Sequence, residues 1–156
     1  MNTSDQSLFP MDSAFKRRWD WEYVPVCYDE KTDEGKDNKA SLFKINISEE
    51  YNANWLAFLR GVNEKIKDTT YSEDKQMGNY FIKDSVDAAT FINKVMYYLW
   101  SEVCKEEYKT DKNFFRYENK DGDIVEFSFN ELFPINDKAK AILKSFIERM
   151  IEVGNK

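Results

Sequence analysis

Three stretches of the chain repeat hydrophobic residues at spacings of three and four, which is the period of an amphipathic helix. These apolar stripes cover residues 55–66, 88–103 and 139–150. The middle stretch is apolar over the widest arc, which predicts a helix that packs on more than one side. Gly154 ends the third stretch, and polar residues suited to N-caps precede the second and third. The candidate caps are Asp84 or Ser85 and Asn136 or Asp137.

Shorter segments carry the pattern of β-strands. Residues 41–47 alternate apolar and polar side chains, which predicts one short strand. Residues 114–117 and 124–127 flank the pair Asp121-Gly122, a sequence typical of a tight β-hairpin turn. The chain has only 5 glycines and 3 prolines, which favours helices over a loop-rich β fold. We therefore expect a mainly α protein with small β elements, an α+β fold.

The first quarter of the chain has fewer regular patterns. Asp12 can cap a short helix, and residues 19–24 alternate as a strand would. Residues 28–40 are almost entirely charged or small, which predicts a solvent-exposed loop or linker. A strand at 19–24 would have no neighbour to pair with, and an unpaired edge promotes self-association. Deleting residues 1–40 is therefore expected to improve solubility.

The composition limits the chemistry that the chain can perform. Hydrophobic residues make up 42% of the chain, which is enough for a packed core. A net charge of -6 disfavours non-specific binding to nucleic acid, because cationic side chains supply most of that affinity. There is no histidine, and Cys27 and Cys104 are the only cysteines, so His-dependent nucleophiles, a zinc site and a disulfide framework are all disfavoured. Without a membrane-length apolar run or a signal-peptide pattern, we expect a cytoplasmic protein with no metal site of its own.

A block of polar and basic residues near the N-terminus has the most specific motif. It contains Asn2, Thr3, Asp5 and Ser7, followed by Asp12, Ala14, Arg17 and Arg18. In residue type and spacing this first block resembles the sensor-1 and arginine-finger region of McrB-type AAA+ proteins. Those proteins are the nucleotide-driven subunits of modification-dependent restriction systems. Gln6 and Lys16 differ from the residues common at their positions in that family.

A second block is similar to the helical lid of the same family. Its residues are 76–81, 91–95 and 98–100. Together the two blocks imply an edge of an AAA+ α/β subdomain followed by a helical lid that carries a β-hairpin. The implied parts are the C-terminal remnant of the α/β core at 1–27, a variable loop and short strand at 28–49, and the lid subdomain at 50–156.

The resemblance also implies roles for individual residues. Asn2 and Asp5 would lie near the γ-phosphate, where an asparagine can orient the attacking water. Arg17 and Arg18 would reach the nucleotide of a neighbouring subunit, because a guanidinium offers phosphate oxygens a planar, permanently charged fork of donors. In the lid, the candidate nucleotide-binding residues are Gly78, Asn79 and Tyr80. The nucleotide would be GTP or ATP with Mg²⁺, held in the intact assembly and not by this chain alone.

The family pattern implies partners as well. They are a homo-oligomeric AAA+ ring and an McrC-like nuclease subunit, with DNA contacted only through regions that this chain lacks. The sequence has no G-x-x-x-x-G-K-[ST] loop and no strand ending in an acidic pair for Mg²⁺. We therefore expect the chain to form part of an NTPase site and to hydrolyse no nucleotide by itself.

Plainer interpretations of the same residues stay open. Lys16, Arg17 and Arg18 can form an exposed basic run at a helix C-terminus, where cations are favoured by the helix dipole. The segment from Gly78 to Phe81 can be a turn that leads into core aromatics. For the whole chain, the alternative is a stand-alone, non-catalytic helical module for protein interaction, encoded by a truncated gene.

Overall fold

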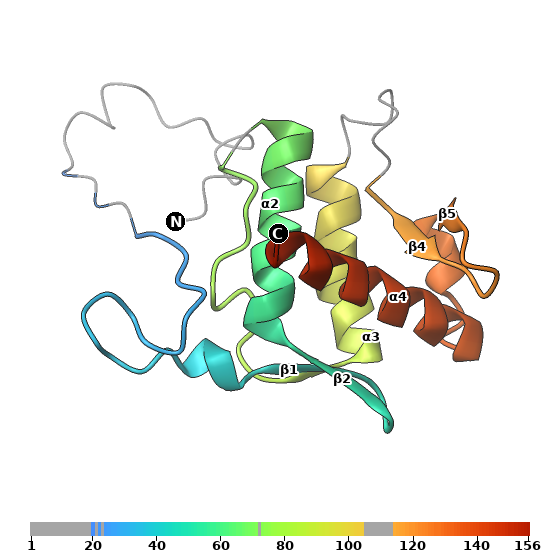
Figure 1. Cartoon of the computed structure of the whole chain (residues 1–156), viewed down its shortest axis with the longest axis horizontal. Helices are drawn as coiled ribbons and strands as arrows, with labels where there is room; N and C mark the ends of the chain where they lie inside the picture. Colours follow the sequence, from blue (N-terminus) through green and yellow to red (C-terminus); the bar gives the residue numbers. More distant parts are fainter. Residues whose placement is uncertain (1–19, 21, 23, 72, 105–113) are drawn as a thin grey trace.

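The computed structural model of the chain describes residues 20, 22, 24–71, 73–104 and 114–156. Three long helical segments and two small sheets make up this part of the molecule, which confirms the predicted α+β fold. In Figure 1, helices α2 (Trp55–Thr70) and α3 (Ala88–Thr90) stand side by side and α4 (Asp137–Gly154) crosses in front of them. The sheet of β1 (Lys44–Ser48), β2 (Tyr51–Asn54) and β3 (Val86–Asp87) lies under the lower ends of α2 and α3. The hairpin of β4 (Arg116–Glu118) and β5 (Ile124–Glu126) lies on the right, beside α4. Among the described residues, no helix is both long enough and apolar enough to cross a membrane.

Helix α2 (Trp55–Thr70) is the first predicted helix, and its stripe faces the core. Asn54 caps it by accepting a hydrogen bond from the backbone N–H of Ala57 at 3.1 Å. Tyr71 ends it in the left-handed conformation, with φ of 55°. Nearly all of the apolar stripe is fully buried, so packing against the core stabilises this helix more than its intrinsic propensity does.

The second predicted helix begins as α3 (Ala88–Thr90) and continues with π-helical winding through Phe91–Met96 and Leu99–Val103. Its N-cap is Asp87, which accepts from the N–H of Thr90 at 2.7 Å, so the prediction of Asp84 or Ser85 as cap was wrong. This hydrogen bond lowers the pKa of the Asp87 carboxyl. The expected wide apolar face is present. Its buried members are Phe91, Ile92, Val95, Met96, Leu99 and Val103.

Helix α4 (Asp137–Gly154) is capped by Asn136, which accepts from the N–H of Ala139 at 3.0 Å. Gly154 is the last residue of this helix, which confirms the predicted end. Its φ is not positive, and the C-cap is Asn155 at φ of −99°. Gly154 instead lies against α2, where only a residue without a side chain fits.

The three-stranded sheet has the order β2-β1-β3. Strand β1 (Lys44–Ser48) pairs antiparallel with β2 (Tyr51–Asn54) and parallel with β3 (Val86–Asp87). The sequence predicted a strand at 41–47, but the 3₁₀ helix η2 (Lys39–Leu42) occupies its first residues. In chain order, β1 and β2 connect the polar N-terminal segment to helix α2.

The predicted hairpin is confirmed as β4 (Arg116–Glu118) paired with β5 (Ile124–Glu126). Gly122 supplies the positive φ of 85° that its turn requires. A short 3₁₀ helix, η5 (Phe129–Leu132), follows the hairpin. It is joined to the second helix by rings in contact, with the centroids of Trp100 and Phe129 5.2 Å apart and nearly parallel.

The region before β1 differs from its prediction in two ways. Residues 20, 22 and 24 form no strand, while Trp19, Trp21 and Tyr23 lie outside the described residues. Residues 29–37 are mostly exposed, as expected of a loop, but Asn38 is 4% exposed and Ala40 is fully buried. The predicted exposed loop is thus confirmed over residues 29–37, while the segment 28–40 is anchored at its C-terminal end.

Candidate functional site

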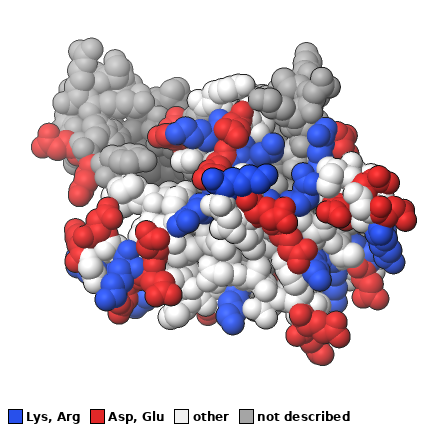
Figure 2. All heavy atoms as spheres, in the orientation of Figure 1, with Lys and Arg blue, Asp and Glu red and all other residues white. Residues whose placement is uncertain are grey.

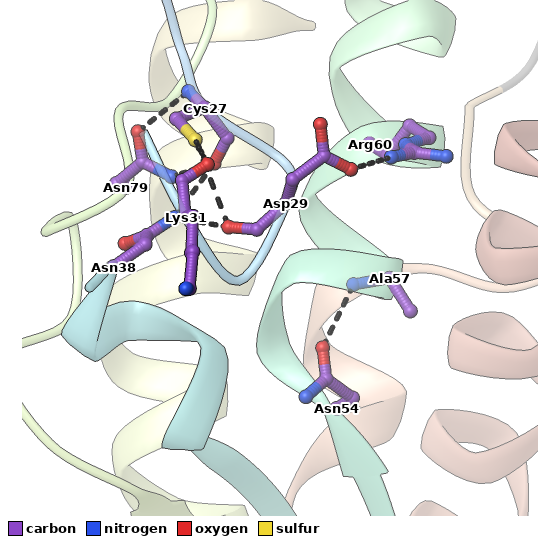
Figure 3. Close-up of polar contacts among 8 residues, drawn as sticks. All are labelled: Cys27, Asp29, Lys31, Asn38, Asn54, Ala57, Arg60 and Asn79. Carbon is purple, nitrogen blue, oxygen red and sulfur yellow. Dashed lines mark hydrogen bonds and ion pairs between the residues drawn. The ribbon is translucent and has the colours of Figure 1, made fainter. Parts of the chain in front are cut away.

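The side chain of Asn79 binds both backbone polar groups of Cys27, a residue 52 positions earlier in the chain (Figure 3). Its Oδ1 accepts a hydrogen bond from the N–H of Cys27 at 2.9 Å, and its Nδ2 donates to the carbonyl oxygen of the same residue. The backbone carbonyl of Asn79 accepts from the indole N–H of Trp55 at 2.8 Å. An asparagine amide carries the same donor and acceptor pair as a peptide, so it replaces a neighbouring strand here.

Asn38 holds the same segment from a second direction. Its Nδ2 donates to the carbonyl oxygens of Cys27 at 3.1 Å and Asp29 at 2.9 Å, while its Oδ1 accepts from the N–H of Ala40 at 3.3 Å. The backbone N–H of Asn38 also donates to the carbonyl of Glu30 at 2.8 Å. We call residues 26–31 the connecting strap, because they follow the first motif block and lie on the helical part of the molecule.

A third asparagine links the strap to the turn that carries the second motif block. Asn63 of α2 is fully buried, and its amide exchanges two 2.8 Å hydrogen bonds with the backbone N–H and C=O of Met77. The same Nδ2 donates to the hydroxyl of Tyr28 at 3.1 Å. Buried amides are costly unless they are hydrogen-bonded, and here each end of the side chain has partners.

Arg60 covers the strap from the exposed side of α2. Its guanidinium lies 5.4 Å from the centroid of the Tyr28 ring and 3.5 Å from a carboxylate oxygen of Asp29. The two side chains of the ion pair are 41% and 83% exposed, so solvent screens most of their attraction. The cation over the ring contributes orientation more than stability.

A hollow of about 280 Å³ opens beside the strap at the first turn of α2. Pockets for drug-sized ligands are usually about 300–1,000 Å³, so this one suits part of a small ligand rather than a whole nucleoside triphosphate. Its walls are polar and carry both signs of charge. The lining residues are Tyr28, Glu30, Ser41, Asn54, Leu56, Ala57, Arg60 and Asn155.

The residues predicted to bind nucleotide lie together in a turn next to the strap. Gly78 accepts from the N–H of Phe81 at 3.0 Å, which confirms the predicted turn. A Cβ added to Gly78 would meet no atom within 4 Å, so this glycine is not required by a close backbone approach. Tyr80 is 57% exposed and is therefore not a core aromatic. Its ring makes a T-shaped contact with that of Phe43, with the two centroids 6.3 Å apart.

The four candidate catalytic residues lie outside the described residues. They are Asn2, Asp5, Arg17 and Arg18. Sequence reasoning missed Asn38 and Asn63 altogether. A signal existed for Asn63, because it sits on the apolar stripe of α2 between Val62 and Ile66, where an unpaired amide would be unfavourable.

The described residues offer no cluster of three or more metal-ligating side chains. Neither Cys27 nor Cys104 takes part in a disulfide among the described residues. In Figure 2, acidic and basic side chains are interleaved over the visible face, without a broad basic area for a polyanion. The chemistry that this part of the chain supports is positioning of segments by hydrogen bonds.

Comparison with known proteins gives one informative similarity. The chain is 34% identical over 110 residues to the type II restriction enzyme BsuMI component YdiS of Bacillus subtilis (strain 168). The match covers 67% of this chain and 30% of that protein, so the chain spans less than a third of its relative's length. No family model and no solved structure matches the chain. The similarity points to a component of a restriction system.

Proposed function

We propose that the chain is the C-terminal part of an McrB-like AAA+ NTPase subunit of a restriction system, with residues 50–156 acting as its lid. One observation carries this proposal. Asn79, from the second motif block, binds Cys27, in the strap that follows the first motif block. The second block is therefore hydrogen-bonded to the segment that follows the first block, as expected of a lid attached to a nucleotide-binding core.

In this proposal the first block serves a nucleotide held by a neighbouring subunit. Asn2 and Asp5 position the attacking water, while Arg17 or Arg18 stabilises charge on the phosphoryl oxygens in the transition state. The exposed turn at Gly78–Tyr80 faces the nucleotide of its own subunit. GTP or ATP with Mg²⁺ is the ligand, and the active unit is a ring of such subunits in the cytoplasm.

The relative's printed name gives the proposal its biological setting. YdiS is described as a component of a type II restriction enzyme. We infer that this chain works within a multi-component system, with an McrC-like nuclease subunit as the partner. DNA would be contacted by other regions, in keeping with the net charge of -6.

Reconstitution tests this function. The chain alone is expected to hydrolyse neither GTP nor ATP, because its sequence lacks a phosphate-binding loop. When it is mixed with a P-loop-containing subunit of its own system, phosphate release should rise in proportion to the chain added and level off at a fixed stoichiometry. Hydrolysis by the chain alone, or no stimulation of the partner at any ratio, would contradict the proposal and favour an interaction module.

A further inference from the structure

The exposed loop that follows the connecting strap is fixed at both of its ends. Cys27 is gripped by Asn79 and Asn38, and beyond the loop the chain is fixed again at Asn38, which bonds back to Glu30. Lys31 and Asp37 form a backbone bridge across the base of the loop. Since both ends are tied to the same body, a bend within residues 32–36 cannot move the first motif block relative to the helical domain.

The chain changes character immediately before the strap. Val24 is 78% exposed and Pro25 is also exposed, whereas Val26, Cys27 and Tyr28 are half-buried. Val26 and Tyr28 pack against the hydrophobic core. Pro25 has no N–H to donate and a restricted φ, so the hydrogen-bonded segment does not extend through it toward the N-terminus.

We propose that Asn79 is a positioning residue whose amide locks Cys27 to the helical domain, and that the flexion point between this domain and the first motif block lies at Val24–Pro25. The charged loop at 28–40, which the sequence suggests as the linker, then moves with the helical domain. This inference rests on the proposed function for its meaning, because it states which joint sets the position of Arg17 and Arg18.

The two native cysteines provide a test on the full-length chain. Cys27 is half-buried, and its Sγ lies 3.4 Å from the carbonyl oxygen of Lys31 and 3.6 Å from that of Asp29, within the strap. Cys104 is 7% exposed and lies in the core. The rate at which a thiol reagent such as DTNB modifies Cys27 therefore reports release of the strap, and the rate at Cys104 reports opening of the core.

Asn79→Ala removes both hydrogen bonds to Cys27 but leaves the backbone carbonyl that binds Trp55. Modification of Cys27 should become roughly tenfold faster, as expected for the loss of two ordinary hydrogen bonds. Modification of Cys104 should keep its rate. Asn79→Asp retains an acceptor for the Cys27 N–H but cannot donate to the Cys27 carbonyl. Modification of Cys27 in this variant should therefore be faster than in the parent chain and slower than in Asn79→Ala.

Asn136→Ala is the matched control, because it removes an asparagine cap from α4 without touching the strap. It should leave the rate at Cys27 unchanged relative to that at Cys104. Inserting Gly-Ser-Gly between Asp33 and Glu34 should also leave Cys27 unchanged, since both ends of the loop stay tied.

Two results would overturn the inference: no change at Cys27 in Asn79→Ala, or a parallel rise at both thiols. A faster rate at Cys27 in the loop insertion would place the flexion point in the loop instead. The measurement uses neither nucleotide nor a second subunit. It can therefore fail while the proposed function stands, or succeed while reconstitution fails.

Discussion

Gly61 of α2 and Gly154 of α4 lie directly against each other where the two helices cross. A Cβ added to Gly61 would stand 1.6 Å from the carbonyl oxygen of Met150, and one added to Gly154 would stand 2.7 Å from the backbone nitrogen of Gly61. No backbone atom can move aside as a flexible side chain can, so the crossing depends on both residues lacking a side chain. This contact fixes α4 across α2 and thereby the shape of the helical domain.

Gly61→Ala should destabilise the domain by about 3 kcal/mol or more, at or above the upper end for overpacked cores, because the clash is with backbone. Urea unfolding followed by circular dichroism measures this. Gly78→Ala is the matched control, since a Cβ there meets nothing, and it should stay within about 0.5 kcal/mol of the parent. Equal stabilities for the two variants would show that α2 and α4 do not cross at these glycines.

Asn63→Ala should cost about 3 kcal/mol, because it leaves the N–H and C=O of Met77 buried without their partners. Tyr28→Phe removes the 3.1 Å bond to the same amide but keeps both bonds to Met77, and it should cost about 1 kcal/mol or less. The two variants are compared by denaturant unfolding. If Tyr28→Phe were the more damaging variant, the hydrogen bonds between Asn63 and Met77 would not be the main contribution of this amide to stability.

A truncated chain that starts at Ser41 should unfold at a lower temperature than the full chain and aggregate more readily. The truncation removes Ala40, which is fully buried, and deprives Asn79 and Asn63 of the strap groups that they bind. This is the opposite of the solubility gain expected if an unpaired strand at 19–24 promotes self-association. Differential scanning fluorimetry and light scattering decide between these two expectations. A 41–156 fragment that is more soluble and equally stable would show that residues 1–40 do not pack onto the helical domain.

Alkaline pH should weaken the fold partly through Tyr51. Burial, and next the nearby Glu148 carboxylate, raise the pKa of this phenol from 10.0 to about 12. The folded chain thus holds the proton more tightly than the unfolded chain. The resulting stabilisation is fully present below the unfolded pKa and is lost as the pH rises through about 10 to 12.

Tyr51→Phe keeps the ring, over which the Lys144 ammonium lies at 5.2 Å, but cannot ionise. The parent should therefore lose more unfolding free energy than Tyr51→Phe between about pH 9 and pH 12. Parallel losses in the two proteins would show that this phenol has the same pKa in the folded and unfolded states.

Much of the helical architecture follows from the periodicity of the sequence. The stripes of α2 and α4 and the hairpin turn at Gly122 were predicted from residues close together in the chain, because each depends on local spacing. The strands β2 and β3 were not predicted. They have 4 and 2 residues, too few for a period to show, and they exist because β1 pairs with both.

The candidate site was predictable only in part for a similar reason. Gly78, Asn79 and Tyr80 were selected through the family resemblance, but nothing local indicates that the Asn79 amide binds a peptide 52 residues away. The burial of Asn38 and Ala40 was likewise hidden, since charged residues dominate the pattern of 28–40. Long-range hydrogen bonds of this kind leave no periodic signal in a single sequence.

The proposed function depends most on the first motif block, from which this chain would supply an arginine to a neighbouring subunit's nucleotide. The direct measurement is nucleotide turnover by the chain mixed with a P-loop-containing subunit of its own system. Arg17→Ala or Arg18→Ala should lower turnover at least about a hundredfold, given that arginine fingers contribute roughly 10³–10⁵ in rate. Lys16→Ala, which removes a neighbouring cation, should retain most of the activity. Equal turnover with all three variants and the parent would contradict the claim.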